Sequence, residues 1–251
     1  QQAAQELDDA LSGVRQSATQ VAGHLRIKVP TTLNQFYLGQ MLVEFQERHP
    51  DLSLEIVAID RAVNARLEGF DLAVGVTPES HVGVLEVGLC AIQRRLVAAP
   101  AYLRAHGRPA EPRELLQHDI LSFQPTGNSW SFQGPQGLIV LNLQPRLSCN
   151  DGQQLLRATL AGQGIACLST YVVQADIKAR RLVPVLQEFP MPEFWIHLQV
   201  PEARAHLASV QALVSFLQER FQPLPPWAGS WRGAARTADV VGALKTTSPM
   251  R

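Results

Sequence analysis

Two short stretches of the chain carry the residue types that could bind a charged small molecule. The first is Thr31–Leu33, which follows the apolar run Leu25–Val29 and precedes apolar residues at helical spacing. The second is Asn150-Asp151, which follows Arg146–Cys149 and precedes a similar helical pattern. Backbone amides at the start of a helix are unpaired and carry partial positive charge, so each start could hold an anion. This arrangement indicates binding rather than catalysis.

The same residues also fit a purely structural role. Thr32 stands three residues before Gln35, and Asp151 stands three residues before Gln154. Both spacings match a capping box, in which a side-chain oxygen accepts from an amide of its own helix. We expect Thr32 to serve both roles and Asp151 chiefly to cap. An uncompensated Asp151 carboxylate would repel an anionic ligand.

Further ligand contacts are expected where predicted strands end, because open α/β sheets bind ligands at the carboxyl ends of their strands. Asp60 follows the second predicted strand, Val76 ends the third, and Ser122-Phe123 ends a later one. Each of these residues could instead be a cap or a core residue. The full set expected to bind the ligand is Thr31, Thr32, Leu33, Asp60, Val76, Ser122, Phe123, Asn150 and Asp151.

Residue patterns typical of catalysis or metal binding are absent from the sequence. The seven histidines have no paired spacing, and there is no Gly-rich phosphate loop or Ser-His-Asp set. Cys90, Cys149 and Cys167 are far apart and odd in number, which fits a reducing compartment. Cys149 borders Asn150, so a redox switch is one interpretation, although a small buried hydrophobe is favoured. We expect no catalytic residue, no metal and no cofactor.

The overall composition bounds the class of protein. The 251 residues are 46% hydrophobic, and 22 basic side chains balance 22 acidic ones. A zero balance argues against direct nucleic-acid binding by this chain. No apolar run reaches the roughly 18 residues of a membrane span, and the polar start QQAAQELDD does not resemble a signal peptide. These features predict a soluble, cytoplasmic protein.

The order of predicted elements indicates a doubly wound α/β fold. Strand Leu25–Val29, a helix ending near His49-Pro50, strand Leu52–Ile56, a short helix Arg61–Glu68 and strand Phe70–Val76 alternate along the chain. The pattern recurs after Cys149, with a hairpin predicted at 128–143, a returning strand at 194–200 and an amphipathic helix at 205–221.

Five phrases then follow in a specific order: EFQERHPDLSLEI, EGFDLAVGV, AAPAYLRAHGRP, NDGQQLLRATLAGQGIACLS and ARRLVPVL. Together they resemble the effector-binding domain of LysR-type transcriptional regulators, over about residues 7 to 221. The resemblance implies two α/β subdomains that clasp a small effector, a fold similar to periplasmic binding proteins. It also implies a DNA-binding domain upstream that this chain does not include, and an N-terminal linker helix that dimerises.

Sequence pattern and resemblance together predict a division of the chain. Residues 1–23 would be the linker or dimerisation helix, with a heptad seam that could alternatively pack on its own domain. Regulatory subdomain I would comprise 24–90 and 197–222, and subdomain II would comprise 91–196. Two crossovers, near 90–95 and 195–197, would join them. The Pro-, Gly- and Ser-rich residues 223–251 are predicted to be a disordered tail, with docking of its tryptophans as the alternative.

The resemblance also implies partners. It predicts a small-molecule effector and a homodimer or homotetramer that assembles through 61–68 and 205–221. Two helix starts that face one cleft suit a carboxylate-bearing effector, and the lack of a long apolar run predicts no membrane partner. Many members of the subgroup of LysR-type regulators that this chain resembles carry an Arg near Gly75-Val76. This chain lacks that Arg, which puts a simple carboxylate effector in doubt. Three alternatives stay open: a solute-binding protein of a transporter, an enzyme on this scaffold, and a truncated chain that captures full-length partners.

Overall fold

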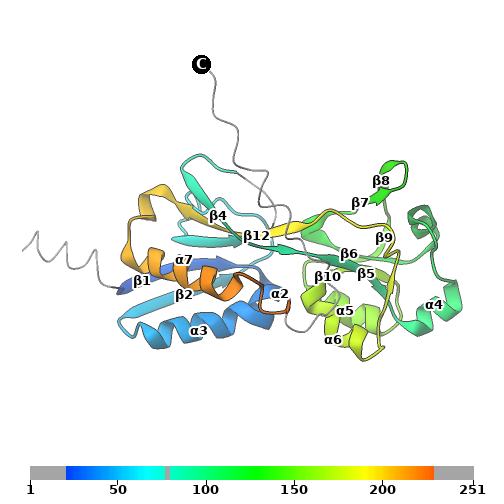
Figure 1. The fold of residues 1–251 in the computed structure, drawn as a ribbon, viewed down its shortest axis with the longest axis horizontal. Coiled ribbons are helices and arrows are strands. Elements are labelled where there is room, and N and C mark those ends of the chain that lie inside the picture. Colours follow the sequence, from blue (N-terminus) through cyan, green and yellow to red (C-terminus); the bar gives the residue numbers. More distant parts are fainter. Residues whose placement is uncertain (1–20, 77–79, 229–251) are drawn as a thin grey trace, which may run out of the picture.

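The computed structural model describes residues 21–76 and 80–228, which form two five-stranded sheets flanked by helices. Figure 1 shows the two units side by side along the long axis, with β12 running from one toward the other. No helix in the described ranges is long and apolar enough to cross a membrane.

The first sheet has the strand order β2-β1-β3-β12-β4. Strand β1 runs parallel to β2 and β3, while β12 is antiparallel to β3 and β4. Alternate residues of β1 (Leu25, Ile27 and Val29) are fully buried, as period-2 patterning requires, and belong to one core with residues of α3 and α7. The bounds are β1 Gly23–Val29, β2 Leu52–Ala58, β3 Leu72–Gly75, β4 Val84–Ile92, β12 Phe194–Pro201, α3 Gly39–Arg48 and α7 Ala208–Phe221.

The second sheet has the order β11-β5-β10-β6-β9, in which β6 runs parallel to β9 and β10. Helices α5 and α6 cover it, and the β7-β8 hairpin predicted from sequence is present. The bounds are β5 Arg94–Ala98, β6 Ile120–Phe123, β7 Ser129–Gly134, β8 Gly137–Asn142, β9 Pro145–Cys149, β10 Ile165–Ser169, β11 Val183–Val185, α4 Pro100–His106, α5 Gly152–Leu160 and α6 Thr170–Lys178. Short 3-10 turns lie at Pro112–Gln117, Gln124–Thr126 and Glu202–Arg204.

Two segments connect the sheets. The chain leaves the first sheet at Gln93, between β4 and β5, and returns between β11 and β12. The segments meet where the Arg94 guanidinium lies 3.7 Å from the ring centroid of Phe194. The mixed α/β architecture with two crossings agrees with the fold class predicted from the sequence.

The helix predicted at Arg61–Glu68 is wrong, because residues 61–64 are irregular and residues 65–69 form a turn. Val63 and Ala65, two residues apart, are both buried against Phe70 and Ala73. A helix would direct positions i and i+2 to different faces, so burying both requires a non-helical path.

The first helix also begins differently from the prediction. Pro30 is its N-cap, Thr32 lies inside the short helix α2 (Thr31–Leu33), and no side chain caps it. The predicted Thr32 capping box is therefore wrong. Helix α2 continues into a π-helical turn, Asn34–Leu38, and then into α3. The last helix begins at Ala208 rather than Ala205, after the 3-10 turn at Glu202–Arg204.

The chain after α7 differs from the predicted disordered tail as far as the structure describes it. Trp227 is only 6% exposed and packs on the core. Residues 229–251, and most of the predicted linker helix at 1–23, lie outside the described residues.

Candidate ligand-binding cleft

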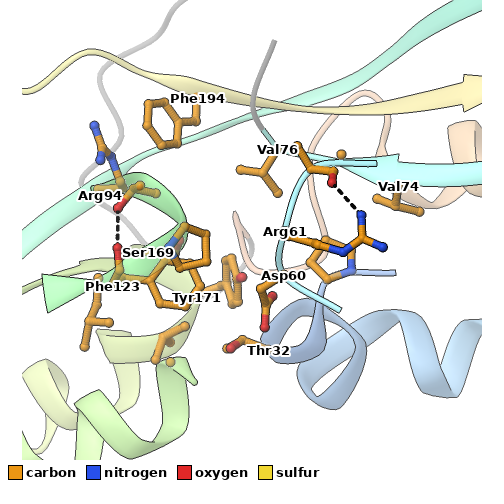
Figure 2. Close-up of a pocket in the computed structure, with 18 of the residues that line it drawn as sticks. Thr32, Asp60, Arg61, Val74, Val76, Arg94, Phe123, Ser169, Tyr171 and Phe194 are labelled. Carbon is orange, nitrogen blue, oxygen red and sulfur yellow. Dashed lines mark hydrogen bonds between the residues drawn. The ribbon is translucent and has the colours of Figure 1, made fainter. Parts of the chain in front are cut away.

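A cavity of about 100 Å³ lies between the two sheets. Strands β1, β3 and β12 contribute Lys28, Gly75 and Gln199 from the first sheet, and β6 and β10 contribute Phe123 and Ser169 from the second. Figure 2 shows Thr32 and Asp60 on one side of this space, with Phe123, Ser169 and Tyr171 on the other. The cavity therefore lies where the ends of strands from both sheets converge, as expected for this architecture.

The starts of helices α2 and α5 face each other at the cavity. Thr32 is 6% exposed, and its Oγ1 finds no hydrogen-bond partner in the described parts of the chain. Gly152 is the first residue of α5, and a Cβ atom there would lie 2.7 Å from Thr32 Oγ1. With threonine at position 32, only a glycine fits at position 152, and this close approach brings the two halves of the cleft into contact.

The cavity holds a buried cation and a half-buried acid. Lys28 is 4% exposed, and its Nζ donates a hydrogen bond to the carbonyl of Val74 at 3.2 Å. Asp60 Oδ1 accepts from the backbone N–H of Thr31 at 2.9 Å. Burial raises the pKa of Asp60, while hydrogen bonds from Thr31 and the charge of Lys28 oppose that rise. The site thus combines a fixed positive charge with a carboxylate that is partly destabilised.

Two arginines line the cavity but have other partners. Arg61 donates to the Glu68 carboxylate at 2.9 Å, and its side chain is largely exposed. Arg94 stacks on Phe194, and Figure 2 shows its guanidinium pointing away from the cavity. Lys28 is therefore the basic side chain best placed to meet an anion inside the cavity.

The remaining wall is mainly apolar. Tyr171 in α6 is 7% exposed, and burial raises the pKa of its phenol, so it stays protonated and can donate a hydrogen bond. The other apolar side chains that line the cavity are those of Pro30, Ala62, Val63, Val74, Val76, Phe123, Pro125, Leu168, Val172 and Phe194. Such a wall suits a ligand with an apolar body and few polar groups.

The structure brings four of the nine residues expected to bind ligand into the cavity lining: Thr32, Asp60, Val76 and Phe123. Thr31 contributes a backbone N–H to Asp60, and Leu33 is fully buried in the core. These two residues support the cavity without lining it.

The other three predicted residues also lie outside the lining. Ser122 is fully buried and donates to Asn128 Oδ1 at 2.6 Å. Asn150 is exposed. Asp151 caps α5 by accepting from the backbone N–H of Gln153 at 2.8 Å, as the structural interpretation predicted.

The sequence reasoning missed Lys28, Gly152, Tyr171 and Gln199 as lining residues. One signal was available: Lys28 is a charged residue inside the apolar strand LRIKV, directly before the first helix start. The Gly152–Thr32 approach joins segments 120 residues apart, which no local pattern reveals.

No group of three His, Cys, Asp or Glu side chains that could hold a metal ion exists among residues 21–76 and 80–228. All three cysteines are free thiols. Cys149 is half-buried, and its Sγ donates to the carbonyl of Asp151 at 3.4 Å.

Comparison with known proteins gives a consistent result. A family model described as the LysR substrate binding domain matches residues 18–222. The HTH-type transcriptional regulator PtxR of Pseudomonas aeruginosa is 28% identical over 219 residues, which cover 85% of this chain and 69% of the relative. The regulator CrgA of Neisseria meningitidis serogroup C is 30% identical, over 66% of this chain and 56% of the relative.

Solved structures share the fold. The regulatory domain of CrgA from Neisseria meningitidis, a LysR-type transcriptional regulator, superposes with a TM-score of 0.71 at 26% identity, covering 80% of this chain and 99% of that one. The full-length Vibrio cholerae virulence activator AphB superposes with a TM-score of 0.77 at 21% identity, covering 86% of this chain and 75% of that one. At that identity the second likeness shows the fold alone.

Proposed function

The chain belongs to the LysR substrate binding domain family, and from this premise we propose that its cleft binds a small acid with an apolar body. Its role is that of a ligand-sensing regulatory domain that controls transcription. The proposal adds to this role the chemical class of the effector, which is a small acid with an apolar body.

The observation that carries this proposal is the buried Lys28 ammonium in an otherwise mainly apolar cavity. A bound carboxylate could accept a charge-assisted hydrogen bond from the Lys28 ammonium, in addition to the hydrogen bond that the Val74 carbonyl accepts from it. Lys28 would thereby take the place of the Arg that the sequence lacks near Gly75-Val76. The Thr32 hydroxyl, which has no partner in the described structure, would donate a second hydrogen bond.

Ligand binding would also hold the two subdomains together. We propose subdomain I as 24–90 with 197–222, and subdomain II as 91–196. Lys28 and Thr32 belong to the first, whereas Tyr171 and Gly152 belong to the second. A ligand in contact with both subdomains would shift the equilibrium toward the closed arrangement. The size of the shift equals the difference between its binding free energies for the closed and open forms. That shift would be passed to a DNA-binding domain elsewhere in the full regulator.

The other proposed properties follow from the family. We propose that the chain catalyses no reaction, that it acts in the cytoplasm, and that it assembles into a homodimer or homotetramer. The flank predicted for assembly, 61–68 and 205–221, remains a proposal, although 61–68 is not helical. Sedimentation of the purified chain at micromolar concentration tests it, and a strict monomer would count against it.

A transporter role has no support, because the relatives are named as regulators of transcription. The functional proposal is tested by a thermal-shift screen with small carboxylates, amino acids and aromatic metabolites on the parent and on Thr32→Ala. We expect carboxylates with apolar bodies to raise the melting temperature of the parent, and less so that of the variant. A screen in which such acids have no effect while other classes stabilise the protein would overturn the proposed ligand class.

A further inference from the structure

Trp227, which follows the last helix, packs into a cluster of aromatic rings. Its ring centroid lies 5.0 Å from that of Tyr171, 5.2 Å from that of Tyr37 and 5.9 Å from that of Phe221. Trp227 is only 6% exposed, so its side chain is part of the hydrophobic core. Such ring spacings are those of favourable aromatic pairs.

The ring cluster joins the two halves of the cleft. Tyr37 lies in the π-helical turn after α2, and Phe221 ends α7, so both belong to the side of the first sheet. Tyr171 lies in α6, which packs on the second sheet. Figure 1 shows the segment after α7, in orange to red, passing close to α2. Trp227 therefore contacts both halves at once.

The cluster also reaches the ligand cavity. Tyr171 contributes to the cavity lining, and Phe36 and Tyr37 contact it edge-on with centroids 5.9 and 6.0 Å away. Trp227 packs on Tyr171 but does not itself line the cavity. A change at Trp227 would therefore act on the cavity through Tyr171.

We propose that residues 223–228 form an intramolecular strap, in which Trp227 is a positioning residue that holds the cleft closed and fixes Tyr171 in the cavity wall. The family match ends at residue 222, so the strap lies beyond the part of the chain that the family describes. The effect of the strap on ligand affinity rests on the proposed function, whereas its effect on closure does not.

Closure can be measured without a ligand through the contact between Thr32 and Gly152. The Cβ of Thr32 lies 3.4 Å from the Cβ position of Gly152, close to the spacing within a disulfide. We would measure the rate at which a fixed excess of oxidised glutathione, which is reduced to two glutathione thiols, forms the disulfide in the double variant Thr32→Cys/Gly152→Cys, made with Cys149→Ser. The other native thiols are buried, and burial raises the pKa of Cys90 to about 12, so their interference is small.

Three further changes are compared in this background. Trp227→Ala removes the contact, Trp227→Phe keeps a smaller ring, and Leu224→Ala is the matched control because Leu224 lies in the same segment but is 67% exposed. We expect disulfide formation to slow by roughly tenfold in Trp227→Ala, which loses three ring contacts, and by less in Trp227→Phe. Leu224→Ala is expected to match the parent.

Equal rates in the parent and Trp227→Ala would overturn the strap. If Trp227→Ala loses its cooperative thermal transition, the same rate is measured in a chain that ends at Gln222 and therefore lacks the strap. A rate of disulfide formation in that chain equal to that of the parent would also overturn the strap. Because no ligand is present, failure of the strap is separate from failure of the proposed ligand class.

Discussion

The side chain of Thr32 lies directly against Gly152, so that a methyl group at Gly152 would come within 2.7 Å of Thr32 Oγ1. Space rather than backbone conformation requires glycine here, because Gly152 does not adopt a left-handed φ. The two residues come from opposite halves of the cleft. Their contact sets how closely the halves approach.

Replacing Gly152 by alanine is therefore expected to act as a wedge. The clash should lower the free energy of unfolding by about 1–3 kcal/mol, or force the two halves apart, as overpacking does elsewhere. Thr32→Ala should relieve the clash, so the double variant should be more stable than Gly152→Ala alone. Thermal unfolding of the four proteins in this cycle measures the coupling.

The control for this prediction is Gly88→Ala, since nothing lies within 4 Å of a Cβ at Gly88. It should change stability by no more than about 0.5 kcal/mol. If Gly152→Ala behaves like Gly88→Ala, the close approach of the helix starts is not present in solution.

Asp60 should make stability depend on pH. Because burial raises the pKa of Asp60 in the folded chain, the folded state holds this proton more tightly than the unfolded state does. The stability that this proton contributes is fully present below the ordinary pKa of Asp in the unfolded chain. It is lost as the pH rises through the higher pKa of Asp60 in the folded chain. Asp60→Asn should remove this loss while its amide oxygen still accepts from Thr31. Chemical denaturation from pH 3 to pH 7, roughly spanning that window, measures it.

The matched control is Asp51→Asn, at an exposed turn. Asp60→Asn should also bind acidic ligands more tightly than the parent does, because it removes a negative charge from the cavity. If the unfolding free energy of Asp60→Asn varies with pH in the same way as that of the parent, burial does not destabilise the Asp60 carboxylate.

The three thiols should differ in reactivity. Cys90 and Cys167 are buried, and burial raises the pKa of both, whereas Cys149 is half-buried. Because the thiolate is the reactive form, iodoacetamide should modify Cys149 first in the native protein. Mass spectrometry of partly modified protein gives the order. Earlier modification of Cys167 would show that the cleft opens far more than the structure indicates, and earlier modification of Cys90 would show that the core around it opens.

Local sequence patterns predicted much of the fold because those patterns reflect local requirements. The apolar alternation of Leu25, Ile27 and Val29 and the Asp151 cap each depend on a few neighbouring residues. The prediction for 61–68 failed because helical propensity there yields to the burial of Val63 and Ala65 under the first sheet. Tertiary packing decided that segment.

The site was predicted only in part for the same reason. Thr32 and Asp60 follow from the rule that ligands bind at strand ends. Gly152 and Tyr171 line the cavity because two distant segments meet there, and Trp227 packs where composition indicated disorder. Contacts of this kind depend on the tertiary arrangement and leave no periodic pattern in the sequence.

Lys28→Met should remove the positive charge from the cavity and leave the shape of the cavity largely unchanged. Methionine keeps an unbranched apolar side chain of similar length, but the hydrogen bond to the Val74 carbonyl is lost and Asp60 loses the nearby positive charge. We expect stability to fall by about 1–3 kcal/mol, which is less than the total stability of a typical domain. The fold should therefore persist, while affinity for an acid should fall about 10- to 100-fold with the loss of a charge-assisted hydrogen bond. A variant that fails to fold would indicate that Lys28 is structural.

Calorimetric titration of the parent and Lys28→Met with small branched and aromatic carboxylates, each paired with its uncharged amide, measures whether the cleft binds an acid through Lys28. We expect that at least one acid binds the parent, that its amide binds far more weakly, and that Lys28→Met removes the difference. Equal binding of acid and amide, acid binding that is insensitive to Lys28→Met, or no binding of any acid would contradict this expectation.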